Sequence, residues 1–176
     1  YEKAQKADDR AKRLSEKKGS DQKDALQEIA KARAFVADAL SQSQLAHDRL
    51  SSVLESRRFA MNANAQNLFP SRWKDAEASL ERTAYSVRER PEEVSDKVVD
   101  LDRRYISLEK DAVAKTHLDP ARQTLEKARK EGAATYAPRS LKEAQLQFDQ
   151  SLAAIRGSPR NELEVEQASK WAQQKA

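Results

Sequence analysis

Four of the five prolines in the chain form a repeated frame, and this frame constrains the fold more than any other feature of the sequence. The interval from Pro70 to Pro91 equals the interval from Pro138 to Pro159, so the whole frame occurs twice in the same register. Because proline fixes φ and lacks a backbone donor, each of these residues interrupts a helix or begins one. The matched spacing predicts a duplicated structural unit.

The segments inside the two frames share a helical apolar pattern. FPSRWKDAEASLERTAYSVRERP and APRSLKEAQLQFDQSLAAIRGSP both carry apolar residues three and four positions apart, which places these residues on one face of a helix. The matched pairs are Trp73 and Leu141, Ala76 and Ala144, Leu80 and Phe148, Ala84 and Leu152, and Val87 and Ile155. We therefore expect repeat units at residues 1–68, with an incomplete start, at 69–136, and at 137–176, which is truncated.

The composition argues against a thick hydrophobic core. Of the 176 residues, 38% are hydrophobic and 35% are charged, and the chain has only 3 Gly and 5 Pro. Such a composition is typical of long solvated helices, and no segment has the pattern of a β-strand. The sequence predicts an all-α fold, in one elongated helical region over residues 1–176. The pattern is already helical at Tyr1, so we expect an interior segment of a longer protein.

A long helix is expected from Asp21 to about Gln66, because apolar residues recur there at unbroken three- and four-residue spacing. The apolar members of this stripe are Leu26, Ile29, Val36, Leu40, Leu50, Leu54, Met61 and Leu68, and its polar members are Arg33, Ser43, His47, Arg57 and Asn64. We interpret the stripe as a heptad seam. A second stripe predicts a helix over residues 92–117 and contains Val94, Val98, Leu101, Tyr105, Leu108 and Ala112.

Helix-breaking residues divide the chain into elements. Turns are expected at Gly19, Pro70, Pro91, Pro120, Pro138, Gly157 and Pro159. Asp119-Pro120 is interpreted as an N-cap followed by the first residue of a helix. Two topologies remain open. If Pro91 lies in a turn, the chain is an elongated antiparallel bundle built from a duplicated helix-turn-helix unit, whose length is the interval from Pro70 to Pro138. If Pro91 only kinks a helix, residues 21–67, 71–117 and 120–156 form a spectrin-like three-helix bundle.

The sequence contains no catalytic, cofactor-binding or metal-binding pattern. His47 and His117 are far apart and lack the spacing of metal ligands, and the chain has no Cys. The net charge is +4, but basic and acidic residues are interleaved, so we expect no nucleic-acid partner. No apolar run is long enough to span a bilayer. We expect a non-enzymatic protein without cofactors, with Trp73, Tyr136 and Trp171 as candidate partner contacts or end-packing residues.

Residues 125–176 follow a recognisable pattern: a Leu-x-x-Ala helix, a Tyr-Ala-Pro turn, another Leu-x-x-Ala helix, a break and an Ala-spaced helix. The matching residues are Leu125, Ala128, Tyr136, Ala137, Pro138, Leu141, Ala144, Leu152, Ala168 and Ala172. With them the chain resembles an Ala-rich helical domain of unknown function in proteobacterial outer-membrane lipoproteins, often found ahead of an OmpA-like peptidoglycan-binding domain. Residues 50–91 match more loosely, with Phe69-Pro70 in place of Tyr-Ala-Pro.

The resemblance implies a location and a role. It implies a periplasmic, outer-membrane-associated protein that acts as a helical spacer or scaffold of the cell envelope and contacts an envelope protein. Peptidoglycan binding, and membrane attachment through an upstream lipid anchor, would belong to regions outside this chain. The alternative is a cytoplasmic coiled-coil adaptor that oligomerises, or binds a helical protein partner, through the seam of residues 26–68.

Overall fold

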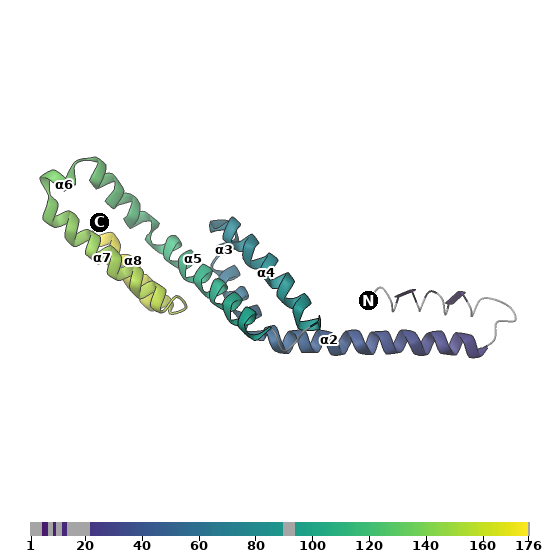
Figure 1. The fold of residues 1–176 in the computed structure, drawn as a ribbon. Helices are drawn as coiled ribbons and strands as arrows, with labels where there is room; N and C mark the ends of the chain where they lie inside the picture. Colours follow the sequence, from purple (N-terminus) through teal and green to yellow (C-terminus); the bar gives the residue numbers. More distant parts are fainter. Residues whose placement is uncertain (1–4, 7–8, 10–11, 14–21, 90–93, 176) are drawn as a thin grey trace. The chain divides into compact units, whose positions relative to one another are not determined.

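The computed structural model describes residues 5–6, 9, 12–13, 22–89 and 94–175, and every regular element within them is a helix (Figure 1). The elements are α2 (Gln22–Asn62), α3 (Ala65–Leu68), α4 (Pro70–Glu89), α5 (Ser95–Lys130), α6 (Ala133–Tyr136), α7 (Pro138–Gly157) and α8 (Glu162–Lys175). The predicted all-α fold is confirmed.

The chain divides into two compact units, and the boundary between them passes through α2 and α4. The first unit is Tyr1–Ser51 with Ala84–Val94, and the second is Ser52–Thr83 with Ser95–Ala176. Neither unit coincides with the predicted repeat units, because each collects segments that are distant in sequence. The site described below lies in the second unit.

In the first unit, the apolar stripe of α2 is not the most buried face of the helix. Leu26 and Leu40 are 60% and 67% exposed, whereas the small residues Ala32 and Ala39, on a neighbouring face, are half-buried. The stripe is thus largely exposed over this part of the helix, and its interpretation as a heptad seam stays a prediction. The more buried face carries alanines, whose small side chains allow a close approach of other atoms.

The second unit contains two apolar cores that share one helix, α5. The first core is enclosed by the end of α2, α3, the start of α4 and the N-terminal half of α5. Its buried residues are Val53, Ala60, Ala65, Ala76, Leu101, Tyr105, Leu108 and Ala112. Burying a large aliphatic or aromatic side chain contributes roughly 1.5–3 kcal/mol. The predicted stripe of residues 94–112 thus supplies half of this core.

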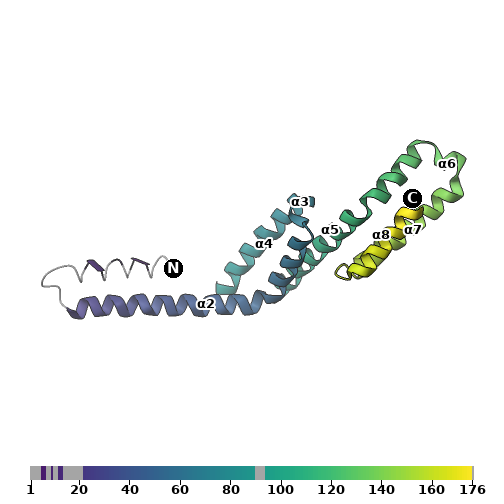
Figure 2. The same ribbon diagram turned by 180° about the vertical axis from the view of Figure 1, so that it is seen from behind.

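The second core is enclosed by the C-terminal half of α5 together with α7 and α8. Both ribbon views place α7 and α8 alongside this half of α5 (Figures 1 and 2). The buried residues are Ala114, Leu118, Ala121, Ile155, Val165, Ala168 and Ala172. We call the two packed groups of helices the first and second bundles.

The hairpin turn of the first bundle recurs in the second, at the interval that separates Pro70 from Pro138. Asn64 (φ 62°, ψ 27°) and Gly132 (φ 91°, ψ 15°) are left-handed, and each precedes a one-turn helix. Phe69 (φ −138°, ψ 60°) and Ala137 (φ −141°, ψ 53°) then lead into α4 and α7, which both begin with proline. A Cβ at position 132 would lie 3.1 Å from the Tyr136 ring. Glycine is therefore favoured here for two reasons: the left-handed backbone, and the lack of room for a side chain. A duplicated unit would produce this recurrence; the duplication itself stays a prediction.

The prediction of a turn at Pro120 is wrong, because Pro120 lies inside α5. The helix boundaries of the spectrin-like alternative are also wrong: α4 ends at Glu89, and α5 runs without a break from Ser95 to Lys130. Gly157 is the last residue of α7, and Pro159 lies in the turn between α7 and α8. Gly19 and Pro91 lie outside the described residues, so their turns stay predictions.

Candidate functional site

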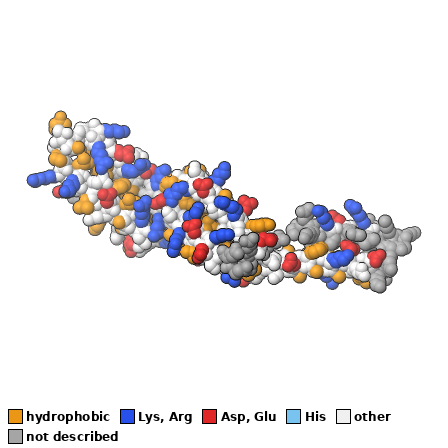
Figure 3. All heavy atoms as spheres, in the orientation of Figure 1, with side chains coloured by type: hydrophobic (Ala, Val, Ile, Leu, Met, Phe, Trp, Pro, Cys, Tyr) orange, Lys and Arg blue, Asp and Glu red, His pale blue; other side chains and the backbone are white. Residues whose placement is uncertain are grey.

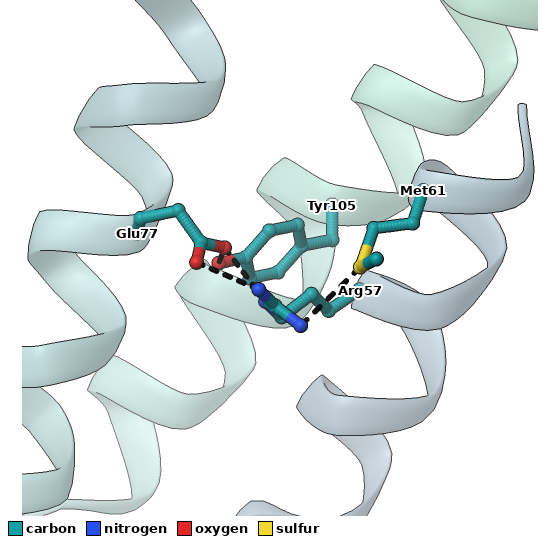
Figure 4. Close-up of polar contacts among 4 residues, drawn as sticks. All are labelled: Arg57, Met61, Glu77 and Tyr105. Carbon is teal, nitrogen blue, oxygen red and sulfur yellow. Dashed lines mark hydrogen bonds and ion pairs between the residues drawn. The ribbon is translucent and has the colours of Figure 1, made fainter. Parts of the chain in front are cut away.

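Three helices of the first bundle meet at a polar cluster formed by Arg57 of α2, Glu77 of α4 and Tyr105 of α5 (Figure 4). Arg57 donates from Nε and Nη2 to the two carboxylate oxygens of Glu77, at 2.7 and 2.9 Å. The Tyr105 hydroxyl donates to Oε1 of Glu77 at 2.6 Å. Nη1 of Arg57 also lies 3.3 Å from the sulfur of Met61. A single carboxylate therefore ties together all three helices through charge-assisted hydrogen bonds.

Trp73 closes one side of this cluster. Its ring meets the Tyr105 ring edge to face at a centroid distance of 5.5 Å, and the Arg57 guanidinium lies 5.5 Å from its centroid. The structure thus places Trp73 among the side chains packed against the first core. Of the two roles predicted for it, this placement matches packing.

The electrostatics of the cluster favour fixed protonation states near neutral pH. Burial, followed by the hydrogen bond to Glu77, raises the pKa of Tyr105 well above its ordinary range. Burial alone would raise the pKa of Glu77, but the hydrogen bonds from Arg57 and Tyr105 outweigh it and hold that pKa below the ordinary value. The hydrogen bond to Glu77 raises the pKa of Arg57. The tyrosine stays protonated and the carboxylate ionised, as suits a structural tie rather than a proton-transfer group.

A second group of ion pairs surrounds the middle of α5, between the two cores. Glu109, which is 3% exposed, accepts hydrogen bonds at 2.7 and 2.8 Å from Arg160, in the turn between α7 and α8. The Arg160 guanidinium also lies 3.6 Å from the centroid of the Phe59 ring of α2. This one arginine therefore connects the turn of the second bundle to two helices of the first.

Asp111, nearby on α5, also joins the two bundles. It accepts a hydrogen bond from Arg72 of α4 at one oxygen and from Arg156 of α7 at the other, both at 2.7 Å. Because two arginines share the one Asp111 carboxylate, these contacts form a network and not an isolated surface ion pair. With Glu109 and Arg160, this network forms what we call the α5 junction.

Local spacing in the sequence does not reveal these groups. Arg57 and Tyr105 stand in the sequence pattern only as members of apolar stripes, and nothing in it distinguishes Glu77, Glu109 or Arg160 from other charged residues. A polar residue within an apolar stripe is a usable signal of a buried polar contact. Its partner could not be identified, because the partners come from helices whose pairing is not encoded in local spacing.

Two of the predicted contact residues are exposed in the second bundle. Tyr136, at the end of α6, is 86% exposed, and Trp171 of α8 is 63% exposed. Neither is brought near the polar cluster or the α5 junction by any described contact. Their predicted role as partner contacts stays a prediction.

The surface of the described residues carries mixed charge. On the face drawn in Figure 3, Lys and Arg side chains lie among Asp and Glu side chains. Within the described residues, no group of three or more His, Asp or Glu is placed to hold a metal ion. None of the described helices is long and apolar enough to cross a membrane.

Comparison with known proteins finds no match: no family model, no curated protein and no solved structure is significantly similar to the chain.

Proposed function

We propose that the chain is a non-enzymatic helical spacer or scaffold that holds its flanking regions, or its partners, at a defined separation. The observation that carries this proposal is that α5, a single helix of 36 residues, forms part of both cores. A helix of that length spans roughly 54 Å. Because both bundles are built on it, the helix itself sets the distance between them.

The α5 junction supports the same role. A spacer must resist bending, and free rotation at the middle of α5 would let the two bundles move independently. Glu109 and Asp111 tie this point to α4, to α7 and to the turn that holds Arg160. A multivalent network of this kind stiffens a connection more than separate surface pairs would.

The proposed setting is the cell envelope, in the periplasm and associated with the outer membrane, with an envelope protein as partner. The support for it is the resemblance carried by Tyr136, Ala137, Pro138 and the alanine-spaced helices around them. Anchoring to lipid or to peptidoglycan would lie outside these residues. Cell fractionation of the tagged full-length protein tests this part, and recovery in the cytosolic fraction would contradict it.

Small-angle X-ray scattering of the chain in dilute solution tests the spacer. We expect a pair-distance distribution with a long tail, typical of an elongated particle, and a compact near-spherical particle would refute the proposal. Replacing both Glu109 and Asp111 with alanine should broaden the distribution by loosening the junction. A matched control replaces the exposed Asp100 and Glu126 of the same helix and should leave the scattering unchanged.

A second candidate is a coiled-coil adaptor that oligomerises or binds a helical partner. The observation that favours it is the α2 stripe, which we define as Leu26, Ile29, Arg33, Val36, Leu40, Ser43 and His47. Its large apolar side chains are 39–67% exposed, and such rows are typical of association surfaces. Sedimentation over a range of concentrations tests this candidate, and a strict monomer would rule out self-association.

A further inference from the structure

A shallow groove of about 270 Å³ lies between α7 and α8 in the second bundle. Two polar groups that line it have no hydrogen-bond partner among the described residues: the hydroxyl of Ser151, a residue 2% exposed, and Nε2 of Gln147. The largely exposed Trp171 lies on the same groove, and Glu164 is the one charged residue among the described residues that line it. A buried polar group without a partner costs roughly 1–3 kcal/mol, so an occupant that offered hydrogen bonds here would be stabilised.

The corresponding face of the first bundle provides an internal comparison. Thr83 of α4 is the counterpart of Ser151 in the repeated frame, and its hydroxyl donates to the carbonyl oxygen of Ser79 at 2.8 Å. At the α5 positions that correspond to Ala168 and Ala172 in the repeated frame, Asp100 and Arg104 form an ion pair at 2.8 Å. The first bundle thus satisfies the Thr83 hydroxyl within α4, whereas the second leaves the Ser151 hydroxyl and the Gln147 amide without a partner, on a groove whose one charged lining residue is Glu164.

The α2 stripe has the chemistry that such a groove would accept. Leu40 and its apolar neighbours can cover the exposed face of Trp171. Arg33 supplies a cation for Glu164, whose side chain is otherwise held by the amide of Asn161 at 2.8 Å. The Ser43 hydroxyl can donate or accept, as the unpartnered groups of the groove require. Charge and hydrogen-bonding capacity on the two surfaces are therefore complementary.

We propose that the α2 stripe of one copy of this chain docks in the α7–α8 groove of a second copy. The groove lies between two packed helices, so the incoming helix packs against both, as an added helix does in a bundle. The contact joins two different surfaces and is therefore heterologous, so repetition extends it head to tail instead of closing a symmetric dimer. This inference rests on the second candidate function and names the surface that the stripe would meet.

The test uses two single variants of the whole chain in sedimentation equilibrium. Leu40→Asp places a charge on the stripe, and Trp171→Asp places one on the groove. Each should weaken self-association by about tenfold or more, as loss of a central contact does. When the two variants are mixed, one intact stripe and one intact groove remain. We therefore expect a 1:1 heterodimer that grows no further.

The control is Leu146→Asp on α7, a residue that is 58% exposed and does not line the groove. It should associate as the unmodified chain does. Circular dichroism of every variant separates lost binding from lost folding. If Trp171→Asp associates normally while Leu40→Asp does not, the stripes pair with each other; this outcome overturns the inference and keeps the adaptor function. A chain that stays monomeric at all concentrations overturns the inference and the self-associating form of the adaptor, and leaves the spacer proposal standing.

Disulfide cross-linking supplies a second measurement, which does not require a variant that weakens the interface between copies. The chain has no cysteine, so Leu40→Cys and Ala154→Cys introduce unique thiols, one in each of two preparations. The inference expects a disulfide between copies in the mixture at low oxidant, with mixed dimers far in excess of either self-dimer. Predominant dimers of Leu40→Cys alone would contradict it.

Discussion

Glu109 and its partner show how much can depend on one side chain in a protein with small helical cores. The carboxylate is almost fully buried, while Arg160, which balances its charge, has a side chain that is 49% exposed. A buried ion pair adds little compared with apolar packing, but removing one partner leaves an uncompensated charge, which is strongly destabilising. The asymmetry makes Arg160 more important for stability than its exposure suggests.

Arg160→Ala should therefore lower the free energy of unfolding by roughly 1–3 kcal/mol, which is less than for a fully buried pair because the Arg160 side chain is 49% exposed. The control Arg104→Ala breaks an exposed pair of similar length, with Asp100, and should cost under about 1 kcal/mol. Urea denaturation followed by circular dichroism measures both. Equal losses for the two variants would show that Glu109 is not dependent on this arginine.

Tyr105 predicts a stability loss at alkaline pH. Its folded-state pKa is raised above the ordinary value of 10.0, so the folded chain holds the phenolic proton more tightly than the unfolded chain. The resulting stabilisation is fully present below pH 10 and is lost as pH rises beyond it. Tyr105→Phe should flatten the decline in melting temperature above pH 10, whereas Tyr136→Phe, at an exposed site, should not. An unchanged slope in Tyr105→Phe would contradict the burial of this hydroxyl.

At the scale of elements, Pro120 shows that a sequence signal can be outweighed by packing. Asp119-Pro120 has the form of a helix start, yet α5 continues through it. Proline removes one intrahelical hydrogen bond and crowds the preceding turn. The carbonyl that loses its helical donor is that of Thr116. The neighbouring carbonyls receive side-chain hydrogen bonds: Ser169 of α8 donates to the His117 carbonyl at 2.8 Å, and Thr124 donates to the Pro120 carbonyl at 3.0 Å. Leu118 and Ala121, on either side of Pro120, are buried in the second core, and this packing keeps α5 continuous.

Pro120→Ala should accordingly stabilise the second unit by roughly 1–3 kcal/mol, because it restores the backbone donor and relieves the clash. Pro138→Ala is the matched control: that proline is the first residue of α7, where its missing donor has no intrahelical partner in any case. Thermal denaturation should show a higher melting temperature for Pro120→Ala alone. A decrease would indicate that the proline is needed for the packing of α8.

The periodicity of α5 was predictable because a local rule decides it. Leu101, Tyr105 and Leu108 are spaced as one helix face, and they are all buried. The α2 stripe obeys the same rule, but Leu26 and Leu40 are exposed. Spacing identifies an apolar face, while burial depends on which helix lies opposite, and that is set by tertiary contacts. In α2 a face of alanines competes with the stripe and is the more buried of the two.

At the scale of the whole molecule, the parts of the candidate site that combine several helices could not be predicted. Glu77 meets Arg57 and Tyr105 only because three helices converge. The sequence separations of these residues do not indicate that they are in contact. The helical class was accessible from composition, since the chain has few residues that end helices. The division into two units was not, because each unit joins segments separated by long stretches of sequence.

The second core should be able to fold without the first. A fragment of residues 113–176 contains every buried residue of the second core. We expect it to be helical and to unfold cooperatively, with lower stability than the whole chain because Glu109 is missing and Arg160 is left without it. Circular dichroism during heating measures this. A fragment 52–94, which lacks α5, should stay largely unfolded; if 113–176 also fails to fold, the second core depends on the first.

Because the two cores share α5, the length of this helix cannot change freely by insertion or deletion. One inserted residue in the middle of this helix would turn everything after it by about 100° and advance it by about 1.5 Å, so α7 and α8 could no longer meet the same face as before. Seven inserted residues would bring the faces back into near alignment, at the expense of the contacts around Glu109 and Asp111. Among sequences related to this one, insertions in the middle of α5 should therefore be seven residues long or a multiple of seven. Insertions of any length should occur only in the turns between helices.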